Sequence, residues 1–219
     1  MGAIQRFNIK KIIDEFDIRY FVETGTLEGD AVQFVKDLQC ENIKEIHSIE
    51  ILEDLHQNCQ SRFEDDENIH IHHGLSVDVL GDIIQEMGDG NILFWLDAHY
   101  PGADVGRASY IQKDKDEREV LPMEAEMRII DNIRGSNHQD VFVCDDLWLY
   151  EDGEYGGYGG QLTTLDNHMK IYHNGETKEQ MGKPDANFVD ELFGDTHDIT
   201  KSKIDQGYIL MFPKRKQTA

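Results

Sequence analysis

The chain has 219 residues, of which 39% are apolar and 30% are charged, so it can bury a core and is too apolar to be disordered. Its net charge of -23 repels phosphate backbones, which disfavours nucleic acid as a partner. The sequence shows no apolar export segment, no apolar run near the roughly twenty residues that a membrane span needs, and no CxxC pair among Cys40, Cys59 and Cys144. We therefore expect a cytoplasmic protein without a membrane partner.

The first hundred residues alternate short apolar strands with amphipathic segments. A strand over 20–23 precedes a glycine turn and a helix in DAVQFVKDL, whose apolar residues recur at helical spacing. Further strands are expected over 45–50, 69–72 and 91–96, with helices in ILEDLHQNCQSRF and SVDVLGDIIQEM between them. Strand-helix repeats that end in a continuously apolar strand predict a parallel sheet with right-handed crossovers.

The pattern changes after residue 100. A charged, glycine-containing stretch predicts a loop insertion at about 101–120, and PMEAEMRIIDNIR and residues 140–144 predict a helix and a fifth strand. Glycine- and tyrosine-rich sequence opens a second loop insertion at about 151–190, and the C-terminal residues predict an antiparallel strand pair. The expected fold is a single α/β domain over 1–219. It is a doubly wound, Rossmann-like, mostly parallel sheet with helices on both faces.

In such a sheet, ligands bind beyond the carboxyl ends of the strands. The first of these ends carries Glu23, Gly25, Thr26 and Gly29. The glycines allow a tight turn and a close approach of the backbone to a ligand, and the next helix offers free N–H groups. A single glycine motif is weakly specific, so an ordinary strand-to-helix turn is an equally good interpretation.

The next two strand ends carry further candidate binding residues. Glu50 is placed to accept hydrogen bonds from the ribose hydroxyls of an adenosine-containing ligand. Alone it would pass for a solvated glutamate of an acidic protein, but the preceding glycine loop favours the binding role. Gly74, Leu75 and Ser76 can flank a planar ring, and Ser76 can also cap the following helix.

Acidic residues follow the fourth and fifth strands. If the strand order is the usual one, Asp97, His99, Asp145 and Asp146 converge on one edge of the sheet. Close carboxylates raise one another's pKa unless a cation lies between them, and oxygen ligands suit Mg²⁺ or Mn²⁺. We predict metal ligation by the three aspartates and a role as base for His99. The alternative is that the aspartates cap the next element or bond backbone N–H groups.

The absence of some motifs disfavours several hydrolase and metal-site functions. The chain has no GxSxG elbow and no P-loop, which disfavours triad hydrolases and phosphate-cradling NTPases. His70, His72 and His73 lack the i, i+4 helical spacing of a zinc site, so we expect a mixture of surface and core positions for them.

Six segments, taken in order, resemble one branch of the class I S-adenosylmethionine-dependent methyltransferases over about residues 20–150. They are VETGTLEGDAVQFV, IHSIE, HIHHGLSVDVL, ILFWLDAHYPG, LPMEAEMRII and VFVCDDLWLY. The usual first motif of that family has three glycines in the pattern E/DxGxGxG, whereas this chain has Gly25 and Gly29 with Thr26 assigned to the place of the second glycine. The resemblance implies that this loop faces the methionine part of the cofactor, Glu50 the ribose, and residues 74–76 the adenine.

The set Asp97, Asp145 and Asp146 looks like the metal ligands of divalent-metal-dependent small-molecule O-methyltransferases, including those that act on sugars of natural products. The resemblance implies methyl transfer to a hydroxyl of a small polar molecule, for which a saccharide is one candidate. The metal would hold a substrate diol and lower the pKa of its hydroxyl. His99 would take the proton, and Asp97 with Glu23 would supply a negative field for the sulfonium. A homo-oligomer is compatible with the sequence.

Two rival functions stay open. A nicotinamide-dependent oxidoreductase also pairs a glycine loop with a distant acidic residue, although the GxGxxG fingerprint is missing from this chain. A non-catalytic binding protein on the same fold would keep the glycine loop and would not need the acidic residues after the fourth and fifth strands.

Overall fold

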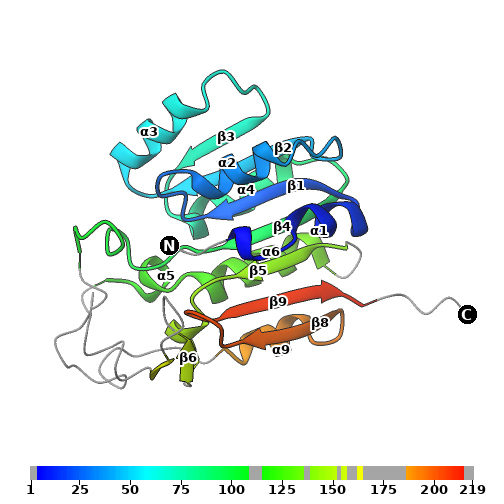
Figure 1. The fold of residues 1–219 in the computed structure, drawn as a ribbon, viewed down its shortest axis with the longest axis vertical. Helices are drawn as coiled ribbons and strands as arrows, with labels where there is room; N and C mark the ends of the chain where they lie inside the picture. Colours follow the sequence, from blue (N-terminus) through cyan, green and yellow to red (C-terminus); the bar gives the residue numbers. More distant parts are fainter. Residues whose placement is uncertain are drawn as a thin grey trace, which may run out of the picture.

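The computed structural model describes residues 4–108, 115–135, 139–151, 154–156, 162–164 and 186–214. Seven strands form one sheet in the order β3-β2-β1-β4-β5-β9-β8 (Figure 1). Strands β1 to β5 pair in parallel, and β9 runs antiparallel to both of its neighbours. The predicted doubly wound sheet with an antiparallel C-terminal pair is therefore confirmed. The strands are β1 Ile18–Thr24, β2 Glu45–Glu50, β3 Ile69–His73, β4 Asn91–Leu96, β5 Val141–Cys144, β8 His197–Ser202 and β9 Tyr208–Pro213.

The strand order reverses between β1 and β4. From β1 the chain moves outward through β2 to β3, and it then returns to the other side of β1 to form β4 and β5. Strands β1 and β4 are paired in register up to Thr24 and Leu96, so both end at the same level. The loops that leave these two strands diverge, and this switch point is where open α/β sheets bind their ligands.

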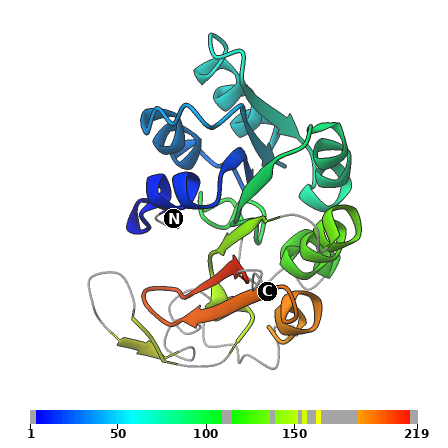
Figure 2. The same cartoon turned by 90° about the vertical axis from the view of Figure 1, so that its right-hand side faces the viewer.

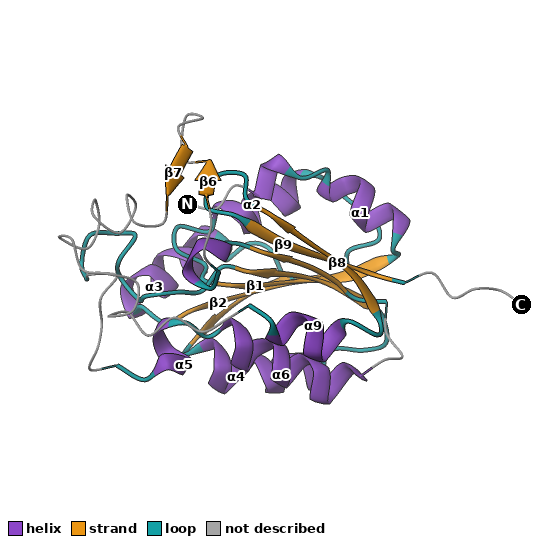
Figure 3. Ribbon diagram, turned by 90° about the horizontal axis from the view of Figure 1, so that it is seen from below, coloured by secondary structure: helices purple, strands orange, loops and turns teal. Residues whose placement is uncertain are grey.

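Helices cover both faces of the sheet (Figure 3). One face packs against η1, α1 and α2, and the other against α4, α6 and α9, which gives two separate apolar cores. In Figure 2 the helix α3 and the C-terminal strands lie at opposite ends of the molecule. The helices are η1 Ile4–Arg6, α1 Ile9–Glu15, α2 Asp30–Asp37, α3 Glu53–Arg62, α4 Ser76–Glu86, α5 Glu117–Val120, α6 Met123–Arg134, η3 Leu147–Leu149 and α9 Phe188–Phe193.

Several elements were not predicted. Helix α1 starts at a side-chain cap, since Asn8 Oδ1 accepts a hydrogen bond from the backbone N–H of Lys11. The expected loop at 101–120 contains the short helix α5, which Asp116 caps through the N–H of Arg118. The expected insertion at 151–190 contains the start of α9 and a small hairpin, β6 Glu154–Gly156 with β7 Leu162–Thr164. Most of the remaining residues of that insertion lie outside the described ranges.

The described helices include none that is long and apolar enough to cross a membrane. The side chains of Cys40, Cys59 and Cys144 are free thiols.

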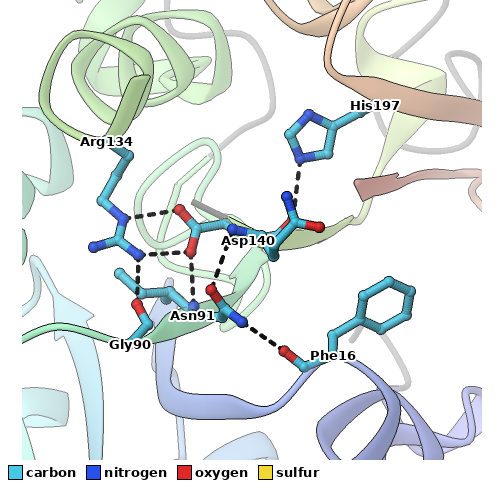
Figure 4. A network of polar contacts seen from close by, with 8 residues as sticks. Phe16, Gly90, Asn91, Arg134, Asp140 and His197 are labelled. Atoms are coloured by element: carbon cyan, nitrogen blue, oxygen red, sulfur yellow. Dashed lines mark hydrogen bonds and ion pairs between the residues drawn. The ribbon is translucent and has the colours of Figure 1, made fainter. Parts of the chain in front are cut away.

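A buried ion pair ties β4, β5 and α6 together at the end of the sheet opposite the switch point (Figure 4). Arg134 donates from Nε and Nη2 to the two carboxylate oxygens of Asp140 at 2.8 and 2.7 Å, and from Nη2 to the carbonyl oxygen of Gly90. Asp140 also accepts the backbone N–H of Ile92, and its own carbonyl oxygen contacts His197 Nε2 at 3.0 Å. Both charged side chains are less than a tenth exposed, so each depends on the other for compensation.

Replacing Asp140 with alanine should lower the free energy of unfolding by about 3–5 kcal/mol, because the Arg134 guanidinium is left buried without its counter-charge. Urea unfolding followed by circular dichroism measures the change. Arg128→Ala breaks the exposed pair with Glu124 on the same helix and should cost less than about 1 kcal/mol. Equal losses in the two variants would contradict the assigned role of the buried pair.

Candidate functional site

A cleft opens at the carboxyl ends of the first four strands. Its walls come from the segments that directly follow β1, β2, β3 and β4, together with residues near α5 and the start of α6. The predicted residues that line it are Gly25, Glu50, Gly74, Leu75, Ser76, Asp97 and His99. The cleft therefore lies at the switch point where the fold is expected to bind a ligand.

Gly25 brings the loops after β1 and β4 into contact. Its φ of 87° lies in the left-handed region, and a β-carbon at this position would lie 2.9 Å from the carbonyl oxygen of Asp97. The assignment of Thr26 to the middle glycine of the E/DxGxGxG pattern is wrong, because that place falls on Leu27, which also has a positive φ, 52°. The loop thus keeps a glycine-like turn there although the residue is a leucine.

Glu50 ends β2 with its side chain held by the backbone on two sides. Its Oε2 accepts the N–H of Leu27 and its Oε1 accepts the N–H of Leu52, both at 2.8 Å. The side chain is 5% exposed, and this burial raises the pKa of Glu50 although the two backbone hydrogen bonds oppose the shift. A carboxylate has about four acceptor positions, so two remain for a ligand's hydroxyl groups.

The end of β3 adds the third wall of the cleft. The N–H of Gly74 donates to the carbonyl oxygen of Glu50, which joins the two strand ends. A β-carbon at residue 74 would lie 2.9 Å from Val79 Cγ1, so glycine allows this turn to close. Ser76 is the first residue of α4, whereas Leu75 occupies the N-cap position without a side-chain cap. The alternative that Ser76 caps the helix is therefore wrong.

Three other predicted cofactor residues, Glu23, Thr26 and Gly29, are not among the residues that line the cleft. Ser48 Oγ lies 2.6 Å from Thr26 Oγ1 and donates to Glu23 Oε2 at 2.5 Å. Burial raises the pKa of Glu23 to about 8. Gly29 packs against Phe63 as it starts α2. The structure thus engages these residues in contacts with β2 and with Phe63, outside the lining of the cleft.

An acidic cluster adjoins the cleft where β4 and β5 end. Asp97, His99 and Asp146 offer ligand atoms that all lie within 4.8 Å of one another. His99 Nδ1 lies 3.0 Å from Asp146 Oδ2, and its Nε2 lies 3.4 Å from Asp104 Oδ2. Asp146 adopts a left-handed φ of 57°, and its Oδ1 accepts the indole N–H of Trp148. These contacts aim its second oxygen at the imidazole.

Asp145 lies beside this cluster but is not one of its three ligand residues. Its Oδ1 accepts the backbone N–H of Asp146, and its Oδ2 is buried without a hydrogen-bond partner among the described residues. Burial raises the pKa of Asp145, and the charge of Asp146 adds to the effect. The three aspartates that were predicted as ligands therefore lie near one another. Only Asp97 and Asp146, together with His99, have ligand atoms within 4.8 Å of one another.

The cluster holds more negative than positive groups. Burial and the neighbouring charges of Asp145 and Asp146 raise the pKa of Asp97 well above its usual range. Burial lowers the pKa of His99, but the carboxylates, with Asp146 foremost, raise it well above its usual value. These shifts favour the protonated form of the His99 imidazole beside the carboxylates. Carboxylate oxygens with an imidazole are also a suitable donor set for a divalent cation.

Asp104 was missed by sequence reasoning. It lines the cleft and contacts His99, although it belongs to the stretch interpreted as a surface loop. The bidentate pair between Arg107 and Asp54 of α3, at 2.7 Å for each contact, ties this loop to the wall opposite. The one usable signal was the position of Asp104 soon after a strand end, because charge alone does not distinguish a cleft residue from a solvated one.

Comparisons with known proteins identify the fold. No family model and no curated protein sequence matches the chain. Among solved structures, a methyltransferase from Podospora anserina with bound SAH has a TM-score of 0.59 at 14% identity, over 98% of this chain and 80% of that one. A putative caffeoyl-CoA O-methyltransferase from Staphylococcus aureus scores 0.58 at 14% identity, over 98% and 85%. An O-methyltransferase from Bacillus cereus in complex with SAH scores 0.55 at 13% identity, over 98% and 82%. The chain thus has the fold of S-adenosylmethionine-dependent O-methyltransferases.

The raised pKa of Glu23 predicts a pH-dependent stability. Between pH 4.5 and about 8 the folded state keeps a proton on Glu23 that the unfolded state has lost, so stability decreases as the pH rises through this window. Glu23→Gln removes this effect. It should gain stability relative to the wild type by roughly 1.4 kcal/mol per pH unit across the window.

Urea unfolding at a series of pH values measures the difference. Glu28→Gln, an exposed substitution in the same loop, should run parallel to the wild type. A Glu23→Gln profile that is also parallel to the wild type would contradict a protonated Glu23 in the folded state.

Proposed function

We propose that the protein is an S-adenosylmethionine-dependent methyltransferase that modifies a hydroxyl group of a small polar molecule with the help of a divalent cation. The observation that carries the proposal is the cleft at the β1/β4 switch point. Glu50 lines this cleft at the end of β2, where the backbone N–H groups of Leu27 and Leu52 hold its carboxylate. The fold shared with solved methyltransferases, two of which contain SAH, supports it.

The cofactor would lie along the cleft in an orientation set by three strand ends. Glu50 would accept hydrogen bonds from the ribose hydroxyls through the acceptor positions that its backbone partners leave unused. Leu75 and Ser76 would flank the adenine. Gly25 would allow the methionine part to approach the backbone closely, and Asp97 would give the sulfonium a nearby negative charge.

Asp97 and Asp146 would hold the cation, with His99 and Asp145 beside them. Two observations support positive charge there: the buried Oδ2 of Asp145 has no hydrogen-bond partner among the described residues, and the neighbouring carboxylates raise the pKa of Asp97. When bound, the cation would lower the pKa of an acceptor hydroxyl. Because the cation would also offset the carboxylates that raise the pKa of His99, the imidazole would be neutral and would take the proton while the hydroxyl oxygen bonds to the methyl carbon and the sulfonium becomes a thioether.

The lining of the cleft favours an uncharged or cationic acceptor. It contains Glu50, Asp97, Asp104 and Glu119, and it contains neither lysine nor arginine among its described residues. An acceptor that carries phosphate groups would be repelled by these side chains and by the net charge of -23. A polyol such as a saccharide fits this electrostatic environment.

Isothermal titration with S-adenosylhomocysteine is the first test. We expect micromolar binding to the wild type and roughly tenfold to hundredfold weaker binding to Glu50→Gln, because charge-assisted hydrogen bonds to the ribose are lost. The control Glu86→Gln, at the exposed end of α4, should bind like the wild type. Wild-type affinity in Glu50→Gln would overturn the ribose assignment. If NAD stabilises the protein against heat and S-adenosylhomocysteine does not, the oxidoreductase alternative replaces the proposal.

The metal role is tested by formation of S-adenosylhomocysteine from S-adenosylmethionine across a panel of small polyhydroxylated acceptors, with Mg²⁺ or with EDTA. Asp146→Asn keeps an acceptor for the Trp148 indole and loses the charge next to His99. It should reduce Mg²⁺-dependent turnover by at least tenfold and leave cofactor affinity within a few-fold. Asp82→Asn on the exposed side of α4 is the control. Turnover that EDTA leaves unchanged would exclude a required cation.

A further inference from the structure

A second group of metal-binding side chains lies outside the cleft, on the edge of the sheet formed by β2 and β3. Glu45, His47 and His70 offer one ligand atom each, and these atoms lie within 4.8 Å of one another. We propose that these three residues bind a transition-metal ion of the zinc type. The proposal is independent of the methyltransferase function, because it uses none of the residues of the cleft.

Strand geometry brings the three side chains together. Side chains alternate along a strand, so Glu45 and His47 lie on one face of β2. His47 and His70 are register partners in the parallel pair of β2 and β3, which places His70 on the same face. The histidines of β3 were expected to be a mixture of surface and core positions because they lack helical spacing. The register of β2 and β3 brings His47 and His70 close together, as the i, i+4 spacing does for two histidines on one helix.

The contacts of His47 orient its ring in two directions. Its Nε2 lies 3.2 Å from Glu45 Oε2, and its Nδ1 lies 3.0 Å from His72 Nε2. Whichever nitrogen binds the ion, the other keeps a partner that fixes the ring, as is usual for metal-bound histidines. The ring centroids of His47 and His70 are 4.8 Å apart, and those of His47 and His72 are 5.3 Å apart.

The donor chemistry selects the class of ion. Two imidazoles and one carboxylate suit Zn²⁺, Ni²⁺ or Cu²⁺, whereas Mg²⁺ prefers oxygen ligands only. Two ligand atoms on one zinc ion are at most about 4.2 Å apart, so small side-chain rotations complete the site. The group is open to solvent at one side, because the Glu45 side chain is 42% exposed while that of His47 is 10% exposed. An ion can therefore enter without unfolding of the strands.

A bound ion would tie the edge strand β3 to β2. Strand β2 ends in Glu50 and β3 is directly followed by Gly74, so the site would stabilise the part of the sheet that forms two walls of the cleft. An ion that binds the folded state alone raises the temperature of unfolding.

The test is titration of EDTA-treated, desalted protein with ZnCl₂ at pH 7.5 in excess Mg²⁺, followed by calorimetry and thermal unfolding. We expect one zinc equivalent with a micromolar dissociation constant at this site and a rise of ~2–4 °C in unfolding temperature. His70→Gln should lose that equivalent. Glu45→Gln, on a largely exposed side chain, should bind it at least tenfold more weakly and checks that loss of binding is not loss of fold.

Two matched variants separate this site from other ligands. His73→Gln changes a histidine of β3 on the opposite face of the strand, and Asp146→Asn changes the cluster beside the cleft. Both should retain the zinc equivalent that His70→Gln loses. Zinc binding that is absent, unaffected by His70→Gln and Glu45→Gln, or lost only in Asp146→Asn would overturn the proposal. Titration with S-adenosylhomocysteine on the same variants reports separately on the proposed function.

Discussion

The contact between the loops that leave β1 and β4 is the constraint on which the site depends. Parallel pairing in register brings Thr24 of β1 and Leu96 of β4 to the same level. The segment after β1 then leads to one side of the sheet and the segment after β4 to the other. Only a residue without a β-carbon fits at position 25, since the carbonyl oxygen of Asp97 would otherwise be 2.9 Å away. The same contact opens the cleft above it and fixes where Asp97 and His99 begin the acidic cluster.

Charge balance is the second organising feature. The protein buries carboxylates at a strand end beside His99, and burial together with the neighbouring carboxylates raises the pKa values of Asp97 and Asp145. Elsewhere a buried carboxylate is paired fully, as Asp140 is with Arg134. The contrast supports the proposal that the cluster beside the cleft binds a positive ligand, whereas the pair at the opposite end of the sheet serves stability.

Residue positions relative to strand ends were the most useful information in the sequence. Glu50 and Gly74 were identified because they follow short apolar strands, and both line the cleft. Glu23 and Gly29 were identified by the same argument, yet neither lines the cleft: Glu23 accepts a hydrogen bond from Ser48, and Gly29 lies against Phe63. A pattern along the chain specifies which residues are near a strand end, but the direction of each side chain depends on hydrogen bonds across strands, such as that from Ser48 to Glu23.

By itself, the sequence determined the doubly wound α/β class, the strand ends that line the cleft, and the acidic residues that adjoin it, because apolar periodicity and turn residues act locally. The tertiary structure decided that Asp104 enters the cleft and that Asp145 stands beside a cluster formed by its neighbours. It also paired His47 with His70 across two strands. These outcomes depend on contacts between residues far apart in the chain, and such contacts follow from strand register and packing, which no local pattern encodes.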